Sequence, residues 1–178
     1  MAHVLRGMAA GLLAGFAASW VMNQFQELQP VHAPQPQEPG MGGSQGQSQP
    51  RQQKAGGSTQ EENATVKTAE TISRNLFGHE LSDQEKQIAG PVVHYGYGSV
   101  IGAIYGGMTE LLPVTGAGFG LPFGAALWLL GDEVAVPALG LAKAPTEYPP
   151  QVHADALSAH FMYGMTTDVL RRILRHVV

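Results

Sequence analysis

The first apolar stretch of the chain, LRGMAAGLLAGFAASWVM at residues 5–22, decides the fold. It holds eighteen residues, and Arg6 is its only charge. At ~1.5 Å per helical residue, this stretch nearly crosses the ~30 Å hydrocarbon core of a bilayer, so we predict a transmembrane helix. The alternative is a cleaved signal peptide, with Ala17-Ala18-Ser19 as a weak cleavage site. The apolar run continues past that site, which favours a retained helix.

Three further apolar stretches follow, at about residues 88–112, 117–136 and 152–174. Together with the first they predict an all-α, polytopic membrane protein, a bundle of about four transmembrane helices. We divide the chain into a first transmembrane helix (1–28), a linker (29–63), an amphipathic helical segment (64–87) and a three-helix transmembrane region (88–178).

The composition fits a membrane protein. Charged residues make up only 13% of the 178 residues, roughly half the share in ordinary soluble proteins. The chain has no cysteine, which excludes a disulfide framework and a thiolate metal site. The net charge of -4 argues against nucleic-acid binding. We therefore expect the lipid bilayer, and no nucleic acid, as a partner.

The linker at 29–63 is rich in Gln, Gly and Pro and contains no aromatic residue, Leu or Ile. Such a segment has nothing to bury that could offset the entropy of ordering it, so we predict disorder.

The segment at 64–87 carries apolar residues at helical spacing, and two capping boxes predict where helices begin. The boxes are Thr59-x-x-Glu62 and Ser82-x-x-Glu85, and Gly78 is the predicted stop between them. Two locations remain open for this segment: the membrane surface, or the polar end of the bundle itself.

Basic residues indicate the orientation of the bundle. Arg171, Arg172, Arg175 and His176 lie at the C-terminal end, and Arg6 lies near the N-terminus. Because Lys and Arg in short flanking segments favour the cytoplasm, we predict that both termini are cytoplasmic. Four spans place both termini on the same side, so the two signals agree.

Three of the four stretches contain glycines at a spacing of four residues. The glycines are Gly7, Gly11, Gly15, Gly98, Gly102, Gly106, Gly116, Gly120 and Gly124. Helices in lipid associate by close packing of small residues, so these glycine ladders predict helix contacts. The same spacing leads to polar residues at Glu110, Asp132 and Asp168, which we therefore expect to face other helices and not lipid.

The predicted topology places six ionisable residues in the outer half of the membrane: His94, Asp132, Glu133, His153, Asp155 and His160. A carboxylate beside a histidine can fix the imidazole tautomer in a structural network, relay protons, or help to bind a metal ion such as zinc, iron or manganese. A haem held between two of the histidines, His94 and His160, is also open. No metal-binding E-x-x-H spacing and no catalytic fingerprint occurs in the sequence, so we expect no enzyme activity and, apart from a metal ion, no cofactor.

The order of these features resembles a known family. Ser19-Trp20 ends the first span, His94 precedes Tyr97-Gly98, and the last span carries Ala159-His160 and ends in Asp168-Val169-Leu170-Arg171-Arg172. Over residues 5–28 and 88–175 the chain is similar to the YagU-like family of uncharacterised bacterial inner-membrane proteins. The resemblance implies a multi-span helical fold in the inner membrane and supplies no catalytic residues.

The sequence therefore predicts an inner-membrane helical bundle with a buried His/carboxylate network that responds to protons or to a metal. One alternative is a structural or assembly subunit that binds a partner membrane subunit. Another is a small transporter, which would have to form a homo-oligomer because four spans make only a thin pore.

Overall fold

The computed structural model describes residues 1–29 and 59–177, and every element in these two ranges is helical. The all-α prediction is confirmed for this part of the chain. The predicted linker lies, from residue 30 to residue 58, outside the described residues. Helix α2 (Thr59–Ile72) already begins within the range assigned to that linker, at the first of the two capping boxes.

Helices α1 (Ala2–Leu28) and α3 (Asp83–Leu111) run antiparallel with their backbones in contact. A Cβ added to Gly11 would overlap the carbonyl oxygen of Gly102, and one added to Gly7 would overlap that of Gly106. The two glycine ladders therefore face each other, which is the close approach that small residues permit between helices.

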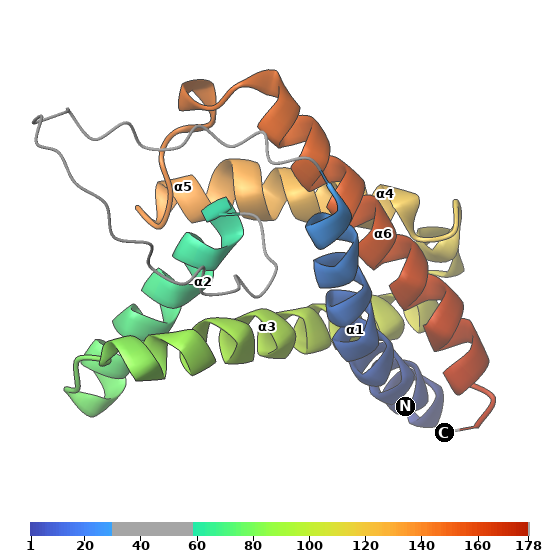
Figure 1. The fold of residues 1–178 in the computed structure, drawn as a ribbon. Coiled ribbons are helices and arrows are strands. Elements are labelled where there is room, and N and C mark those ends of the chain that lie inside the picture. The colour runs from blue at the N-terminus through green and yellow to red at the C-terminus, as the bar shows by residue number, and fades with distance from the viewer. Residues whose placement is uncertain (30–58, 178) are drawn as a thin grey trace, which may run out of the picture.

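Helix α6 (Pro150–Leu174) also packs on α1 (Figure 1), beside α3 on the same buried face of that helix. The small core between α1 and α6 contains Ala18, Met22, Ala159 and Tyr163. The hydroxyl of Tyr163 donates a hydrogen bond of 2.6 Å to the carbonyl oxygen of Gly98, which also ties α6 to α3.

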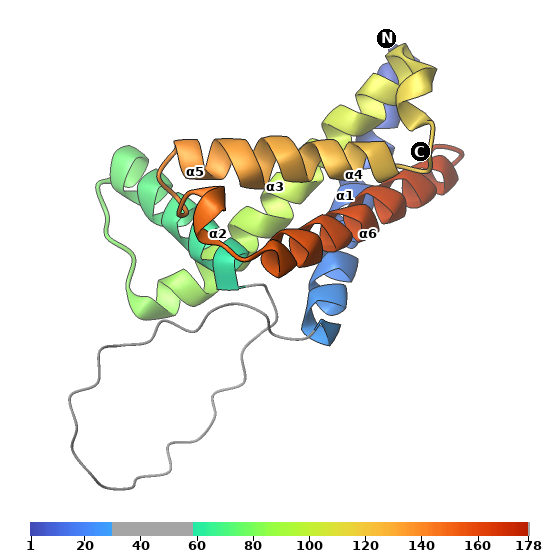
Figure 2. The same cartoon turned by 90° about the horizontal axis from the view of Figure 1, so that it is seen from above.

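The third apolar stretch forms one rod from α4 (Leu121–Leu127) through the π-helical η3 (Trp128–Ala135) to α5 (Val136–Ala138), as Figure 2 shows. This rod packs on α6. A Cβ on Gly124 would overlap the carbonyl oxygen of His160, and one on Gly120 would overlap that of Gly164.

The third glycine ladder does not lie on a single helix, contrary to the expectation from its spacing. Gly116 belongs to the 3₁₀ turn η2 (Pro113–Gly116), and Gly120 has a left-handed φ of 77° just before α4 begins. Because Gly118 and Phe119 also have positive φ, the chain forms a loop here. Pro122 then lies in the first turn of α4, where its fixed φ suits a helix start.

Helix α2 packs on the first turns of α3, and the π-helical turn η1 (Ser73–Phe77) continues α2. Val66 lies against Gly90, and Lys86 Nζ is 2.8 Å from Glu70 Oε1. Of the two locations considered for this segment, the structure shows packing on the protein itself; its relation to a membrane stays a prediction.

The boundary predicted between the amphipathic segment and the second span, at residue 88, falls inside α3. Gly78 ends η1 with a left-handed φ of 64°, and the capping box of Ser82 and Glu85 starts α3, so both local signals are confirmed. Residues 83–87 are therefore the first turns of α3 and not a separate helix.

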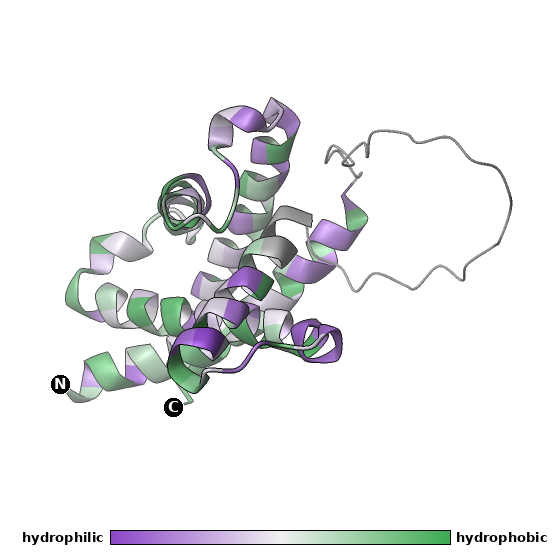
Figure 3. Cartoon of the chain, turned by 90° about the vertical axis from the view of Figure 1, so that its left-hand side faces the viewer, coloured by the Kyte–Doolittle hydropathy of each residue, from purple (hydrophilic) through white to green (hydrophobic). Residues whose placement is uncertain are grey.

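Two helices of the described part are long and apolar enough to cross a membrane: Ala2–Leu28 and Leu121–Ala138. Only 6% of the second is buried, whereas the core helix of a soluble protein is mostly buried. Its outer surface carries exposed Leu129, Leu130 and Val134, and Figure 3 shows further apolar stretches on the helices. These observations favour membrane association. Helices α3 and α6, which contain two of the predicted spans, do not meet the same criteria of length and apolar composition. The number of four transmembrane helices therefore remains a prediction.

Candidate functional site

The first pair of predicted site residues joins η3 to α6. Nδ1 of His153 lies 2.6 Å from Oε1 of Glu133, and Nε2 lies 3.0 Å from the carbonyl oxygen of Pro145. Both ring nitrogens of His153 thus face acceptors. A neutral imidazole has one N–H and can serve only one of them, whereas the imidazolium can serve both. The site is complementary to the charged form of His153.

The second pair lies two turns further along α6. Nδ1 of His160 is 2.9 Å from the carbonyl oxygen of Ala156 and 3.7 Å from Oδ2 of Asp132. Because a carbonyl oxygen only accepts, Nδ1 carries the proton and donates it to Ala156. Asp132 therefore acts on His160 through its charge and not through a short hydrogen bond.

The local structure explains why these four side chains meet. His153 and His160 are seven residues apart and so lie near one face of α6. The contact of Gly124 with the backbone of His160 brings the following π-helical stretch, with Asp132 and Glu133, beside that face. Single π-helical turns within α-helices often occur at functional sites.

The remaining two predicted site residues belong to neither pair. His94 has its ring edge against Tyr95, with 5.6 Å between ring centroids, and its Nε2 is buried without a hydrogen-bond partner in the described structure. The backbone carbonyl of Asp155 accepts hydrogen bonds from Gln29 and Ser158. The structure thus brings four of the six residues together, as two separate pairs.

A metal site receives no support from this geometry. Within residues 1–29 and 59–177, no three His, Asp or Glu side chains come close enough together to hold a metal ion. Two groups suffice for the other two chemistries open for a His/carboxylate pair, a structural contact that fixes the imidazole tautomer and the binding of a proton.

A second group of charged side chains lies outside the predicted site. Near the ends of α3 and α6, fully buried Asp168 accepts a hydrogen bond of 3.0 Å from the hydroxyl of Tyr105. It also accepts bonds of 3.0 Å from Arg171 and 2.8 Å from Arg172. Both carboxylate oxygens of this buried group are therefore paired, as a buried charge requires.

Glu110 of α3 joins the same arrangement. Its side chain is 5% exposed, and its Oε1 lies 2.8 Å from Arg175 Nε and 3.8 Å from Arg171 NH1. The 2.8 Å contact is an ion pair by distance and lacks hydrogen-bond geometry. We call Glu110, Asp168, Arg171, Arg172 and Arg175 the charge cluster.

The sequence carried one signal for this cluster. Glu110 and Asp168 both stand at the spacing of four that marks the packing faces of their helices, but the arginines were interpreted only as signs of orientation. Their pairing depends on α3 and α6 ending side by side, which spacing within one helix does not reveal.

Comparison with known proteins adds a family. A family model described as a protein of unknown function, DUF1440, matches residues 60–169. The chain belongs to the DUF1440 family. No curated protein and no solved structure matches it.

The DUF1440 match includes both His/carboxylate pairs, together with Glu110 and Asp168. Helix α1 precedes the match, and the three arginines of the charge cluster follow it. The match supports membership of a family without a known function, as the resemblance implied; the YagU-like assignment itself stays a proposal.

Proposed function

We propose that this DUF1440 protein is a non-enzymatic, four-span bundle of the bacterial inner membrane, YagU-like and with both termini cytoplasmic, whose packing of η3 on α6 responds to pH. Two apolar helices and the exposed apolar surface of α4 and η3 support the membrane location. The proposed response resides in the pair of His153 with Glu133, and His160 lies near Asp132 on the same two elements.

The observation that carries the proposal is the pair of acceptors around His153. An imidazolium donates one hydrogen bond to Glu133 of η3 and another to the carbonyl oxygen of Pro145, in the segment before α6. The charged form of His153 thus connects both segments to α6. Loss of the proton leaves one acceptor without its donor, which weakens the contact. The contact is therefore tighter in acid and looser as His153 loses its proton.

The groups around His153 are consistent with this direction. Glu133 supplies the neighbouring negative charge, and the ring of Tyr148 lies edge-on to the imidazole with 6.4 Å between centroids. The second pair, His160 with Asp132, has the same two kinds of side chain at a longer separation of 3.7 Å.

The test measures the distance between η3 and α6 as pH changes. The chain has no cysteine, so spin labels can be placed uniquely after V134C and A154C, two exposed positions on these elements. In nanodiscs of bacterial lipid, we expect the distance distribution to broaden and lengthen as the pH rises from acid to alkaline.

His153→Gln provides the decisive variant, because glutamine keeps a donor and an acceptor but does not titrate in this range. We expect most of the pH dependence to vanish. His3→Gln, at an exposed position near the start of α1, is the matched control and should behave like the parent. A distance that does not change with pH in the parent, or that changes equally in H153Q, would exclude the proposed response.

A further inference from the structure

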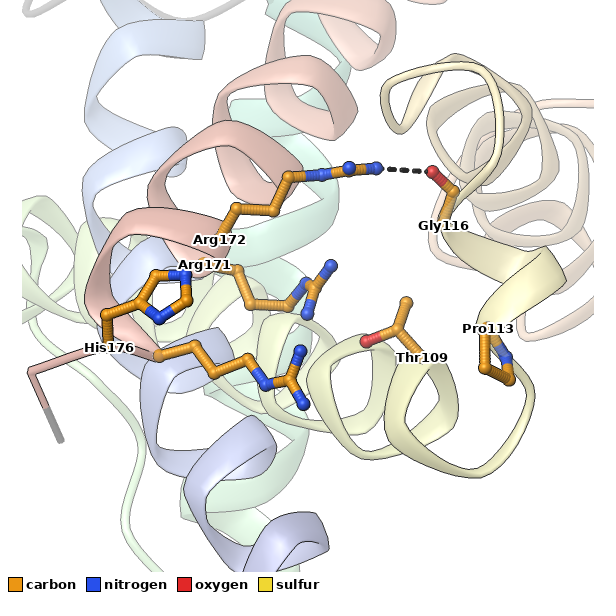
Figure 4. A pocket seen from close by; sticks show the side chains of 7 residues that line it. Thr109, Pro113, Gly116, Arg171, Arg172 and His176 are labelled. Carbon is orange, nitrogen blue, oxygen red and sulfur yellow. Dashed lines mark hydrogen bonds between the residues drawn. The ribbon is translucent and has the colours of Figure 1, made fainter.

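A cavity of about 360 Å³ lies beside the charge cluster, where α3, η2 and α6 end. Figure 4 shows its walls, and we call it the arginine pocket. Its lining residues are Thr109, Pro113, Gly116, Arg171, Arg172, Arg175 and His176. Four of these seven side chains are basic, and none is acidic.

The buried side of the pocket contains an unsatisfied donor. Arg171 has a side chain that is only 6% exposed, and its Nε is buried without a hydrogen-bond partner. Figure 4 shows its guanidinium pointing toward Thr109 across the pocket. A buried, charged donor without an acceptor is costly, so the site is incomplete as a purely internal ion-pair network.

The charge balance of the cluster also favours an anionic ligand. The cluster contains three guanidinium groups and two carboxylates, those of Glu110 and Asp168, so one positive charge is not balanced within it. The side chains of Arg172 and Arg175 are 50% and 46% exposed, so both can reach a ligand from the rim. Guanidinium groups bind phosphate oxygens through paired, charge-assisted hydrogen bonds.

We propose that the arginine pocket binds a phosphate group. Its volume of about 360 Å³ is roughly that of twelve liquid water molecules, which suits a phosphate with a small substituent. Two kinds of ligand carry such a phosphate group: a phospholipid, in its headgroup, and free phosphate.

The surroundings favour the phospholipid. Exposed Leu112, Val114 and Ile173 lie on the elements that form the pocket and offer apolar surface for acyl chains. This preference rests on the proposed function, because it requires the end of the bundle that holds the termini to lie at the cytoplasmic membrane surface, where basic pockets between helices bind anionic headgroups. Binding of phosphate as such does not require that placement.

The test uses the full chain in a maltoside detergent, which carries no phosphate. One arm titrates inorganic phosphate against chloride at matched ionic strength and follows the rise in Tm that binding to the folded state causes. The other arm adds phosphatidylglycerol, or diacylglycerol with the same acyl chains, and counts the molecules retained in native mass spectrometry.

Arg175→Gln removes one guanidinium from the rim and should weaken binding at least about tenfold, because it removes a charge-assisted pair of hydrogen bonds. It also deprives Glu110 of the closer of its two ion-pair partners, so the double variant E110Q/R175Q keeps the net charge of the cluster and should show the same loss. Arg74→Gln, at an exposed position on η1, is the control and should bind like the parent.

Each result decides the proposal. If both phosphate and phosphatidylglycerol bind, the phosphate group is sufficient for binding. If only phosphatidylglycerol binds, the lipid is the source of the phosphate group. Phosphate alone identifies a soluble anion. If neither ligand binds, or if the parent and both Arg175 variants bind equally, the proposal that the arginine pocket binds phosphate is wrong. If the protein is monodisperse in buffer without detergent, the membrane proposal fails, and the phosphate titration still tests the pocket.

Discussion

Replacing Gly102 by alanine should separate α1 from α3. A Cβ at this position would overlap the carbonyl oxygen of Gly11 and lie 2.8 Å from the Cα of Gly15. Both are backbone atoms of α1, so no side-chain rotation can relieve the overlap. The two helices must move apart, and the neighbouring glycine contacts along the interface must open with them.

The expected loss of stability is estimated by comparison with Gly96→Ala on the same helix, where an added Cβ meets nothing within 4 Å. Alanine favours a helix over glycine by about 1 kcal/mol, and this gain is common to both variants. Overpacking a well-packed contact costs about 1–3 kcal/mol. The free energy of unfolding of G102A should therefore fall below that of G96A by about 1–3 kcal/mol.

The assay is reversible unfolding in mixed micelles with a rising fraction of denaturing detergent, followed by far-ultraviolet circular dichroism. The fluorescence of Trp20 on α1 and Trp128 at the start of η3 gives a second signal from the tertiary structure. Equal unfolding free energies for G102A and G96A would refute the backbone contact between the two ladders.

Two further predictions concern buried and exposed carboxylates. Asp168→Asn should lower the free energy of unfolding by about 3–5 kcal/mol, because it leaves buried Arg171 with only the more distant carboxylate of Glu110. Tyr105→Phe removes one hydrogen bond and should cost only about 1 kcal/mol in the same unfolding assay. Hydrogen bonds from the Ser82 side chain and backbone, and then from His79, lower the pKa of exposed Glu85 from 4.5 to about 2. The start of α3 is thus fully stabilised above about pH 4.5 and loses that stability as the pH falls toward 2, and amide hydrogen exchange should show that Glu85→Gln removes this acid sensitivity.

The features that could be predicted from the sequence are those that depend on a few consecutive residues. Gly78 and the box of Ser82 with Glu85 mark helix ends through local backbone geometry, and the structure has both. The third glycine ladder shows the limit of this approach. A spacing of four does not distinguish a helical glycine, such as Gly124, from one in a left-handed loop, such as Gly120.

The features that could not be predicted depend on which helices lie side by side. The carboxylates of Glu110 and Asp168 stand on different helices, and only the packing of α3 and α6 around α1 brings both to the same arginine, Arg171. For the same reason the six ionisable residues placed in one half of the membrane resolve into two pairs, with His94 and Asp155 outside them.

One physical relation connects the glycines with the polar side chains. The carbonyl oxygens of two glycines accept hydrogen bonds from α6: that of Gly98, on the face of α3 that touches α1, from Tyr163, and that of Gly116, in the η2 turn, from Arg172. In lipid, a polar side chain must find its partner inside the protein, so such carbonyls are where buried hydroxyl and guanidinium groups can be satisfied. The glycines of this chain therefore do more than shorten the distance between helices: two of them also provide acceptors for the polar side chains that an apolar bundle holds.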